Sequence, residues 1–356
     1  MRRQHYVFLD GMRGLAAIAV AVLHASELFN LQFVPSHARL AVDFFFCLSG
    51  FVVAYAYDRP LSERMDLSDF SIKRFIRLYP MLLVGVIFGG LVTYLERLAS
   101  GHSTHDVLTL TLTAMVLFPF GLFSAGEAYP VNNPIWSLAF EFLANGVYAV
   151  ERRLLRLPRI IWIGAMVVAA AALLMVIHSA GQLLGVGYGN PKLFVFGLAR
   201  VIFPFFGGVL IYRFSLYKLS FKTPSVIPAA ILIAMLASPL FMGSGKYDAA
   251  SVLIVTPLLV ILGANVETSG RMSQLWTLLG KLSYPFYIVH QPTIRAVALL
   301  GKVLGAEAYP TVVAGLSIIA AVIVSLLLLI LYDEPVRSSL GRLYAKVGHG
   351  TSARTA

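Results

Sequence analysis

Eleven apolar segments dominate this sequence. They cover residues 8–29, 40–57, 79–98, 107–123, 134–150, 159–178, 193–213, 225–242, 249–264, 280–300 and 311–332. An α-helix needs about 20 apolar residues to cross the hydrocarbon layer, and a helix satisfies its own backbone there. Only 13% of the residues are charged, against about 25% in soluble domains. We therefore expect an all-α, polytopic membrane protein with one domain over 1–356, its core spanning about 5–340.

The distribution of Lys and Arg predicts the topology. If the N-terminus is cytoplasmic and 107–123 is a re-entrant or interfacial segment, ten spans remain. In that arrangement 20 of the 28 Lys and Arg lie inside and five outside, as the positive-inside rule requires. The alternative of eleven spans would put the basic cluster 151–159 on the wrong side. We expect a bacterial cytoplasmic (inner) membrane location, both termini cytoplasmic and a short basic tail at 341–356.

The same distribution limits the possible partners and metal sites. The net charge of +11 comes from residues between apolar segments, so we expect membrane lipid around the chain and no nucleic-acid partner. The single cysteine, Cys47, cannot form an internal disulfide or a cysteine-based metal site. No phosphate-loop, zinc-protease or nucleophile-elbow motif is present. We expect no metal site and no tightly bound cofactor.

The first apolar segment carries ionisable residues on one helical face. Arg13 and His24 are eleven residues apart, which places them on one stripe about 16 Å apart along the axis. Asp10 precedes Arg13 by three residues and can pair with it. Charged groups within a span are costly and usually functional. A lone intramembrane histidine can also be a hydrogen-bonded core residue, and this reading of His24 stays open.

Further charged or titratable residues lie in other spans. Glu141 is flanked by apolar side chains and needs protonation or a partner, for which a histidine is a candidate. Asp43 begins the second segment, where a carboxylate also suits a helix N-terminus. His290 sits near the middle of its segment. Arg74 and Arg77 lie three residues apart before 79–98 and either anchor the segment at the inner surface or clamp phosphates.

Six motifs, in order, resemble those of the acyltransferase family 3 membrane proteins. They are Arg13 with His24 after Leu9-Asp10-Gly11-Met12, residues 42–51, Arg74-Phe75-Ile76-Arg77 with Tyr79-Pro80, Trp136-Ser137-Leu138-Ala139-Phe140-Glu141, residues 283–292, and Glu334-Pro335. The resemblance runs from about residue 5 to residue 340. It implies transfer of an acyl group, commonly acetyl, from cytoplasmic acyl-CoA to a carbohydrate hydroxyl at or beyond the outer face.

The resemblance also implies roles for individual residues. Arg13, Arg74 and Arg77 would hold the CoA phosphates. His24 would act as general base or transient acyl carrier, since imidazole exchanges protons near neutral pH. Glu141 would orient or charge-stabilise that imidazole. Asp10, Asp43, Trp136, Ser137 and His290 would support the site or contact substrate.

Some family members carry an additional extracytoplasmic SGNH-type domain, and this sequence resembles a stand-alone member without it. That favours an exopolysaccharide or a lipid-linked oligosaccharide as acceptor, in or outside a polysaccharide assembly complex. A transporter or flippase that moves a glycolipid or acyl group without chemistry is the competing hypothesis, since buried charges in a helical bundle suit transport as well. The absence of duplicated halves in the sequence counts against it.

Overall fold

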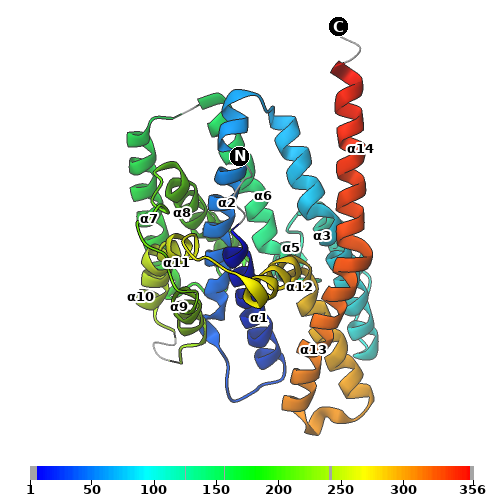
Figure 1. Ribbon diagram of the computed structural model, residues 1–356. Helices are drawn as coiled ribbons and strands as arrows, with labels where there is room; N and C mark the ends of the chain where they lie inside the picture. Colours follow the sequence, from blue (N-terminus) through cyan, green and yellow to red (C-terminus); the bar gives the residue numbers. More distant parts are fainter. Residues whose placement is uncertain (1–5, 125, 156, 240–242, 353–356) are drawn as a thin grey trace.

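The computed structural model describes residues 6–124, 126–155, 157–239 and 243–352. These residues form helices and connecting segments and no strand (Figure 1). The α-helices are α1 (Val7–Leu28), α2 (Ala41–Glu63), α3 (Leu67–Ala99), α4 (Val107–Met115), α5 (Gly121–Ser124), α6 (Ile135–Val150), α7 (Arg159–Ala180), α8 (Pro191–Arg213), α9 (Val226–Ala237), α10 (Gly245–Ala250), α11 (Thr256–Gly263), α12 (Gly270–Val303), α13 (Pro310–Leu328) and α14 (Glu334–Ser352). The prediction of an all-α polytopic membrane protein is confirmed.

Seven helical stretches in the described part of the chain are long and apolar enough to cross a membrane. They are Val7–Leu28, His37–Glu63, Leu67–Ala99, Arg159–Ala180, Pro191–Arg213, Gly245–Gly263 and Pro310–Lys346. The other three predicted spans, at 134–150, 225–242 and 280–300, coincide with α6, α9 and α12. Helix α12 packs against α1, α3 and α13, so neighbouring helices cover much of its polar surface. The total of ten spans remains a prediction.

Segment 107–123 does not form a long helix. Helix α4 has nine residues and is followed by a turn and the four-residue helix α5. Nine helical residues extend about 14 Å, roughly half the hydrocarbon thickness. This short, broken segment agrees with the predicted re-entrant or interfacial segment.

Two helix pairs make the most extensive contacts in the bundle, and glycines permit the close approach of one of them. Helix α1 packs on α12, and α2 packs on α8. A Cβ atom on Gly50 would overlap the backbone of Phe205, and one on Gly208 would overlap the backbone of Cys47. Small residues of this kind let membrane helices approach to backbone contact. The α2–α8 pair therefore provides a rigid support for the side chains that project from α2.

Helix α14 replaces much of the predicted tail. It continues from α13 through a π-helical turn, Leu329–Asp333, and extends beyond the rest of the bundle (Figure 1). Tyr344 on α14 donates a hydrogen bond to Asp69 on α3, and Lys281 pairs with Glu334 at 2.9 Å. We call this end of the bundle, where α2 finishes, α3 begins and α14 lies, the basic end. The distribution of Lys and Arg predicts that it faces the cytoplasm.

Candidate functional site

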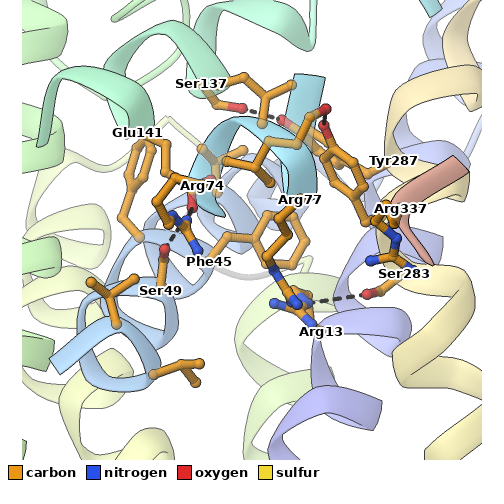
Figure 2. Close-up of a pocket in the computed structure, with 17 residues that line it drawn as sticks. Arg13, Phe45, Ser49, Arg74, Arg77, Ser137, Glu141, Ser283, Tyr287 and Arg337 are labelled. Atoms are coloured by element: carbon orange, nitrogen blue, oxygen red, sulfur yellow. Dashed lines mark hydrogen bonds and ion pairs between the residues drawn. The ribbon is translucent and has the colours of Figure 1, made fainter. Parts of the chain in front are cut away.

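A cavity near the basic end collects the predicted arginines, and we call it the arginine cavity. It lies among α1, α2, α3, α6, α12 and α14 (Figure 2). Its polar lining consists of Arg13, Ser49, Arg74, Arg77, Ser137, Glu141, Ser283, Tyr284, Tyr287 and Arg337. Four guanidinium groups thus meet one carboxylate in the lining. Asp10 and Asp333, which lie outside the lining, pair with Arg13 and Arg337, so four arginines face three carboxylates in all. The remaining positive charge favours an anionic ligand.

The arginines differ in their partners. Arg13 donates to Asp10 at 3.0 Å and to Ser283 at 3.1 Å, so the predicted pairing of Asp10 and Arg13 is confirmed. Arg74 donates to Glu141 at 2.8 Å. Within the described ranges the side chain of Arg77 makes no hydrogen bond or ion pair, although it is exposed to the cavity. Arg77 is therefore the arginine with most hydrogen-bonding capacity left for a ligand.

The position of Glu141 differs from the sequence-based expectation. Its carboxylate accepts from Arg74 and, at 2.6 Å, from the Ser49 hydroxyl on α2. No bond joins Glu141 to His24 among the residues described. Glu141 belongs to the arginine cavity, where it fixes the direction of Arg74.

A second cavity lies toward the opposite end of the bundle and contains the predicted histidine. We call it the histidine cavity, and its polar lining is His24, Glu27, Arg39, Asn133, Trp136, Tyr188, Arg200 and Tyr287. Nδ1 of His24 lies 3.7 Å from a carboxylate oxygen of Glu27, one turn further along α1. A quarter of the His24 side chain is accessible. Glu27, which the sequence analysis did not select, is thus the carboxylate beside His24.

His290 stacks against His24, with ring centroids 5.4 Å apart. Nδ1 of His290 lies 2.8 Å from the carbonyl oxygen of Tyr287, which can only accept, so Nδ1 carries the hydrogen. Nε2 is then a bare acceptor, and it is buried without a hydrogen-bond partner in the structure. His290 therefore supports the ring of His24 and leaves one acceptor atom beside it.

The two cavities are neighbours. Val42 and Tyr287 line both of them. The Tyr287 hydroxyl lies 2.9 Å from the hydroxyl of Ser137, which also donates to the carbonyl of Pro134. Two neighbouring residues that the sequence predicted as part of the site lie on either side of this boundary. Trp136 lines the histidine cavity, and Ser137 lines the arginine cavity. The boundary between the cavities is thus a wall of side chains held by hydrogen bonds.

Asp43 has a structural role. It accepts two hydrogen bonds from Arg200 on α8, at 3.1 and 2.8 Å, and both side chains are almost fully buried. Arg200 also donates to the carbonyls of Arg39, Leu183 and Val186 and lies over the ring of Trp136 at 5.1 Å. All its N–H groups are therefore used. Asp43 and Arg200 hold together α2, α8 and the loop 181–190.

That loop forms one side of the histidine cavity. Leu184 and Tyr188 contribute to the lining. Asp248 accepts from the backbone N–H of Leu183 at 2.8 Å and pairs with Arg39, so the loop is fixed at a second point. Burial raises the pKa of Tyr188, which therefore remains a neutral hydroxyl. The loop presents a fixed polar and aromatic surface to the cavity.

Several residues that line the cavities were not predicted from the sequence. Ser49, Ser283 and Tyr287 lie in motifs that were recognised, but their side chains were not selected. Arg337 follows Glu334-Pro335 by two residues and was not selected either. Glu27 carried one usable signal, because a carboxylate three residues after a histidine on a helix lies beside it. The described ranges contain no group of three or more His, Cys, Asp or Glu that could hold a metal ion.

Comparison with known proteins identifies the family. The family model described as "Acyltransferase domain" matches residues 6–330. The acyltransferase MdmB of Streptomyces mycarofaciens is 28% identical over 94% of this chain and 92% of its own length. The exopolysaccharide production protein ExoZ of Rhizobium meliloti is 28% identical over 82% of this chain and 87% of its own.

A third relative, protein 2 in the picA locus of Rhizobium radiobacter, is 36% identical over 41% of this chain and 82% of its own length. No solved structure matches the chain. The matched residues 6–330 include every residue that lines the arginine and histidine cavities except Arg337. The chain is a membrane protein that belongs to acyltransferase family 3.

Proposed function

We propose that the protein is an O-acyltransferase that moves an acyl group, acetyl in the first instance, from cytoplasmic acyl-CoA to a hydroxyl group of an extracytoplasmic or lipid-linked glycan. The observation that carries this proposal is the pair of adjoining cavities. One is rich in arginine near the basic end, the other holds His24 toward the far end, and Val42 and Tyr287 separate them.

The arginine cavity suits the donor. The phosphates of CoA are polyanionic, and Arg13, Arg74 and Arg77 present guanidinium groups that form charge-assisted hydrogen bonds with phosphate oxygens. Arg74 is already oriented by Glu141, and Arg77 has no partner among the described residues. Phosphates bound here would leave the pantetheine arm to extend past Tyr287 toward His24.

The histidine cavity suits the chemical step. If Nδ1 of His24 carries a hydrogen directed at Glu27, Nε2 is free to take the proton of the acceptor hydroxyl. The hydroxyl oxygen then attacks the thioester carbonyl, the carbon–sulfur bond breaks, and CoA leaves with the proton returned by His24. Glu27 favours the imidazolium that forms in this step, which is the role that the sequence analysis gave to Glu141.

The acceptor proposal rests on the lining of the histidine cavity and on one relative. Trp136 and Tyr188 offer aromatic surfaces, and Asn133 and Glu27 lie within the same lining, which suits a hydroxyl-rich ligand. ExoZ is named for exopolysaccharide production. Both observations favour a glycan, in or outside a polysaccharide assembly complex.

The test is acetyl-CoA turnover by the purified protein in detergent, with free CoA measured in the presence and absence of a panel of glycans. We compare wild type, His24→Ala and, as a matched control, His178→Ala, because His178 is exposed on α7 and lines neither cavity. The proposal requires glycan-stimulated release that His24→Ala abolishes and His178→Ala retains. Equal turnover of wild type and His24→Ala would refute the chemistry. Failure of wild type both to release CoA and to bind labelled acetyl-CoA would favour the transporter.

A further inference from the structure

A third cavity adjoins the arginine cavity at the basic end, and we call it the vestibule. Its lining comes from α2, α3 and α14 and consists of Tyr57, Asp69, Lys73, Ile76, Arg77, Glu334, Arg337, Ser338, Gly341, Tyr344 and Ala345. It encloses about 1530 Å³ of empty space, part of it open to solvent, against about 780 Å³ for the arginine cavity. The vestibule is thus the larger and more open of the two compartments.

Arg77 and Arg337 line both compartments. They approach from different helices, Arg77 from α3 and Arg337 from α14. Arg337 pairs with Asp333 at 2.7 Å through one terminal nitrogen, while its other terminal nitrogen makes no hydrogen bond among the described residues. An anion that passes from the vestibule into the arginine cavity therefore meets two guanidinium groups with unused N–H donors.

The acidic residues of the vestibule already have partners. Asp69 accepts from Tyr344, and Glu334 pairs with Lys281 at 2.9 Å. Lys73 makes no ion pair among the described residues. Arg337 is paired with Asp333, and the hydrogen bond from Tyr344 leaves the charge of Asp69 in place. Within the described ranges the two unpaired cations, Lys73 and Arg77, therefore exceed the one carboxylate that lacks a cationic partner, and the vestibule keeps a net positive charge. The bond between Tyr344 and Asp69 also keeps α14 against α3, which closes the compartment on that side.

From this arrangement we infer that the vestibule binds the nucleotide end of acyl-CoA, with Arg337 of α14 contacting its ribose 3′-phosphate. Arg13, Arg74 and Arg77 then meet the diphosphate deeper in the bundle. The inference rests on the proposed donor. The family match ends at residue 330, so it assigns no role to α14 or Arg337. Helix α14 thereby becomes part of the donor site, although the sequence presents its end as a tail.

The experiment compares acetyl-CoA with 3′-dephospho-acetyl-CoA as donors for the full-length protein. Loss of the charge-assisted hydrogen bonds to one phosphate should weaken the binding of the donor by about ten- to hundredfold. We expect the KM of wild type to be higher for the dephospho donor by about that factor. Arg337→Gln should raise the KM for acetyl-CoA similarly and remove the preference between the two donors. Arg337→Lys, which keeps the charge, should retain part of the preference.

Arg342→Gln is the matched control. Arg342 lies on the same helix, donates to Ser338 and Ser339 and lines neither compartment, so its replacement should leave the preference intact. If Arg337→Gln discriminates between the donors as wild type does, or if wild type uses both donors with equal KM, the inference is wrong while the proposed donor stands. If wild type neither uses nor binds either donor, the proposed function itself fails.

Discussion

The buried pair of Asp43 and Arg200 should control the separation of α2 from α8. In Asp43→Ala, Arg200 keeps its contacts with three carbonyls but loses its counter-ion in a site where its side chain is 1% exposed. Removing one partner of a buried pair costs about 3–5 kcal/mol, because the remaining charge is uncompensated. Loss of the favourable position of Asp43 in the first turn of α2 adds only about 0.3–1 kcal/mol. The unpaired arginine therefore dominates the effect.

Cys47 provides the assay. It is the only cysteine in the chain, fully buried, and lies one turn after Asp43 against Gly208 of α8. A maleimide reagent can reach it only when the helices separate, so the labelling rate is proportional to the population of the open state. At 1.36 kcal/mol per tenfold change, 3–5 kcal/mol corresponds to a rate increase of roughly two hundredfold to several thousandfold.

Two further variants separate charge from packing. Replacing both partners, in Asp43→Leu with Arg200→Met, should restore much of the protection, because no charge remains buried. Glu267→Ala removes an exposed pair with Lys222 and should leave labelling almost unchanged. Labelling of Asp43→Ala at the wild-type rate would contradict the reasoning, as would equal acceleration in the single and double variants.

Three other predictions follow from the contacts. Gly208→Ala should lower the thermal unfolding temperature in detergent, because its Cβ would overlap the α2 backbone. Gly315→Ala, with open space around it, should leave that temperature unchanged, and equal temperatures for the two variants would show that the helices can move apart freely. Glu141→Gln should weaken the charge-assisted bond from Arg74 and raise the KM for acyl-CoA about tenfold, and an unchanged KM would remove the orienting role. Tyr188→Phe should raise the KM for the glycan more than that for acyl-CoA, and the opposite result would place the acceptor elsewhere.

The sequence predicted those features that depend on one helix or on composition. The three-residue spacing of Asp10 and Arg13 predicted the ion pair that the structure contains. The Thr and Pro residues of segment 107–123 predicted that it does not cross the membrane as one helix, and its longest helix has nine residues. Helical periodicity is a local property, so both inferences needed no knowledge of packing. The membrane class followed in the same way from the count of apolar segments.

Contacts between different helices could not be predicted from the sequence in the same way. Glu141 was assigned to His24 because both are isolated titratable groups, yet their partners depend on how far α6 is displaced along α1 and α2. Arg337 could not be placed because the distance between α14 and α3 is set by contacts such as Tyr344 with Asp69. The relative translation of packed helices is decided by side-chain interlocking over the whole bundle, which hydrophobic patterns do not encode.

The wall formed by Val42 and Tyr287 has an electrical consequence. If water enters the two cavities from opposite sides of the membrane, as the proposed function requires, most of the transmembrane voltage falls across the side chains between them, where each elementary charge is worth about 2.3 kcal/mol per 100 mV. Under the proposed function, an acetyl group that crosses this wall carries no charge, so the voltage does no work on it. A succinyl group carries a carboxylate, and a membrane potential negative inside would draw it outward. The membrane potential would thus change the rate of succinyl transfer across this wall and leave the passage of an acetyl group unchanged.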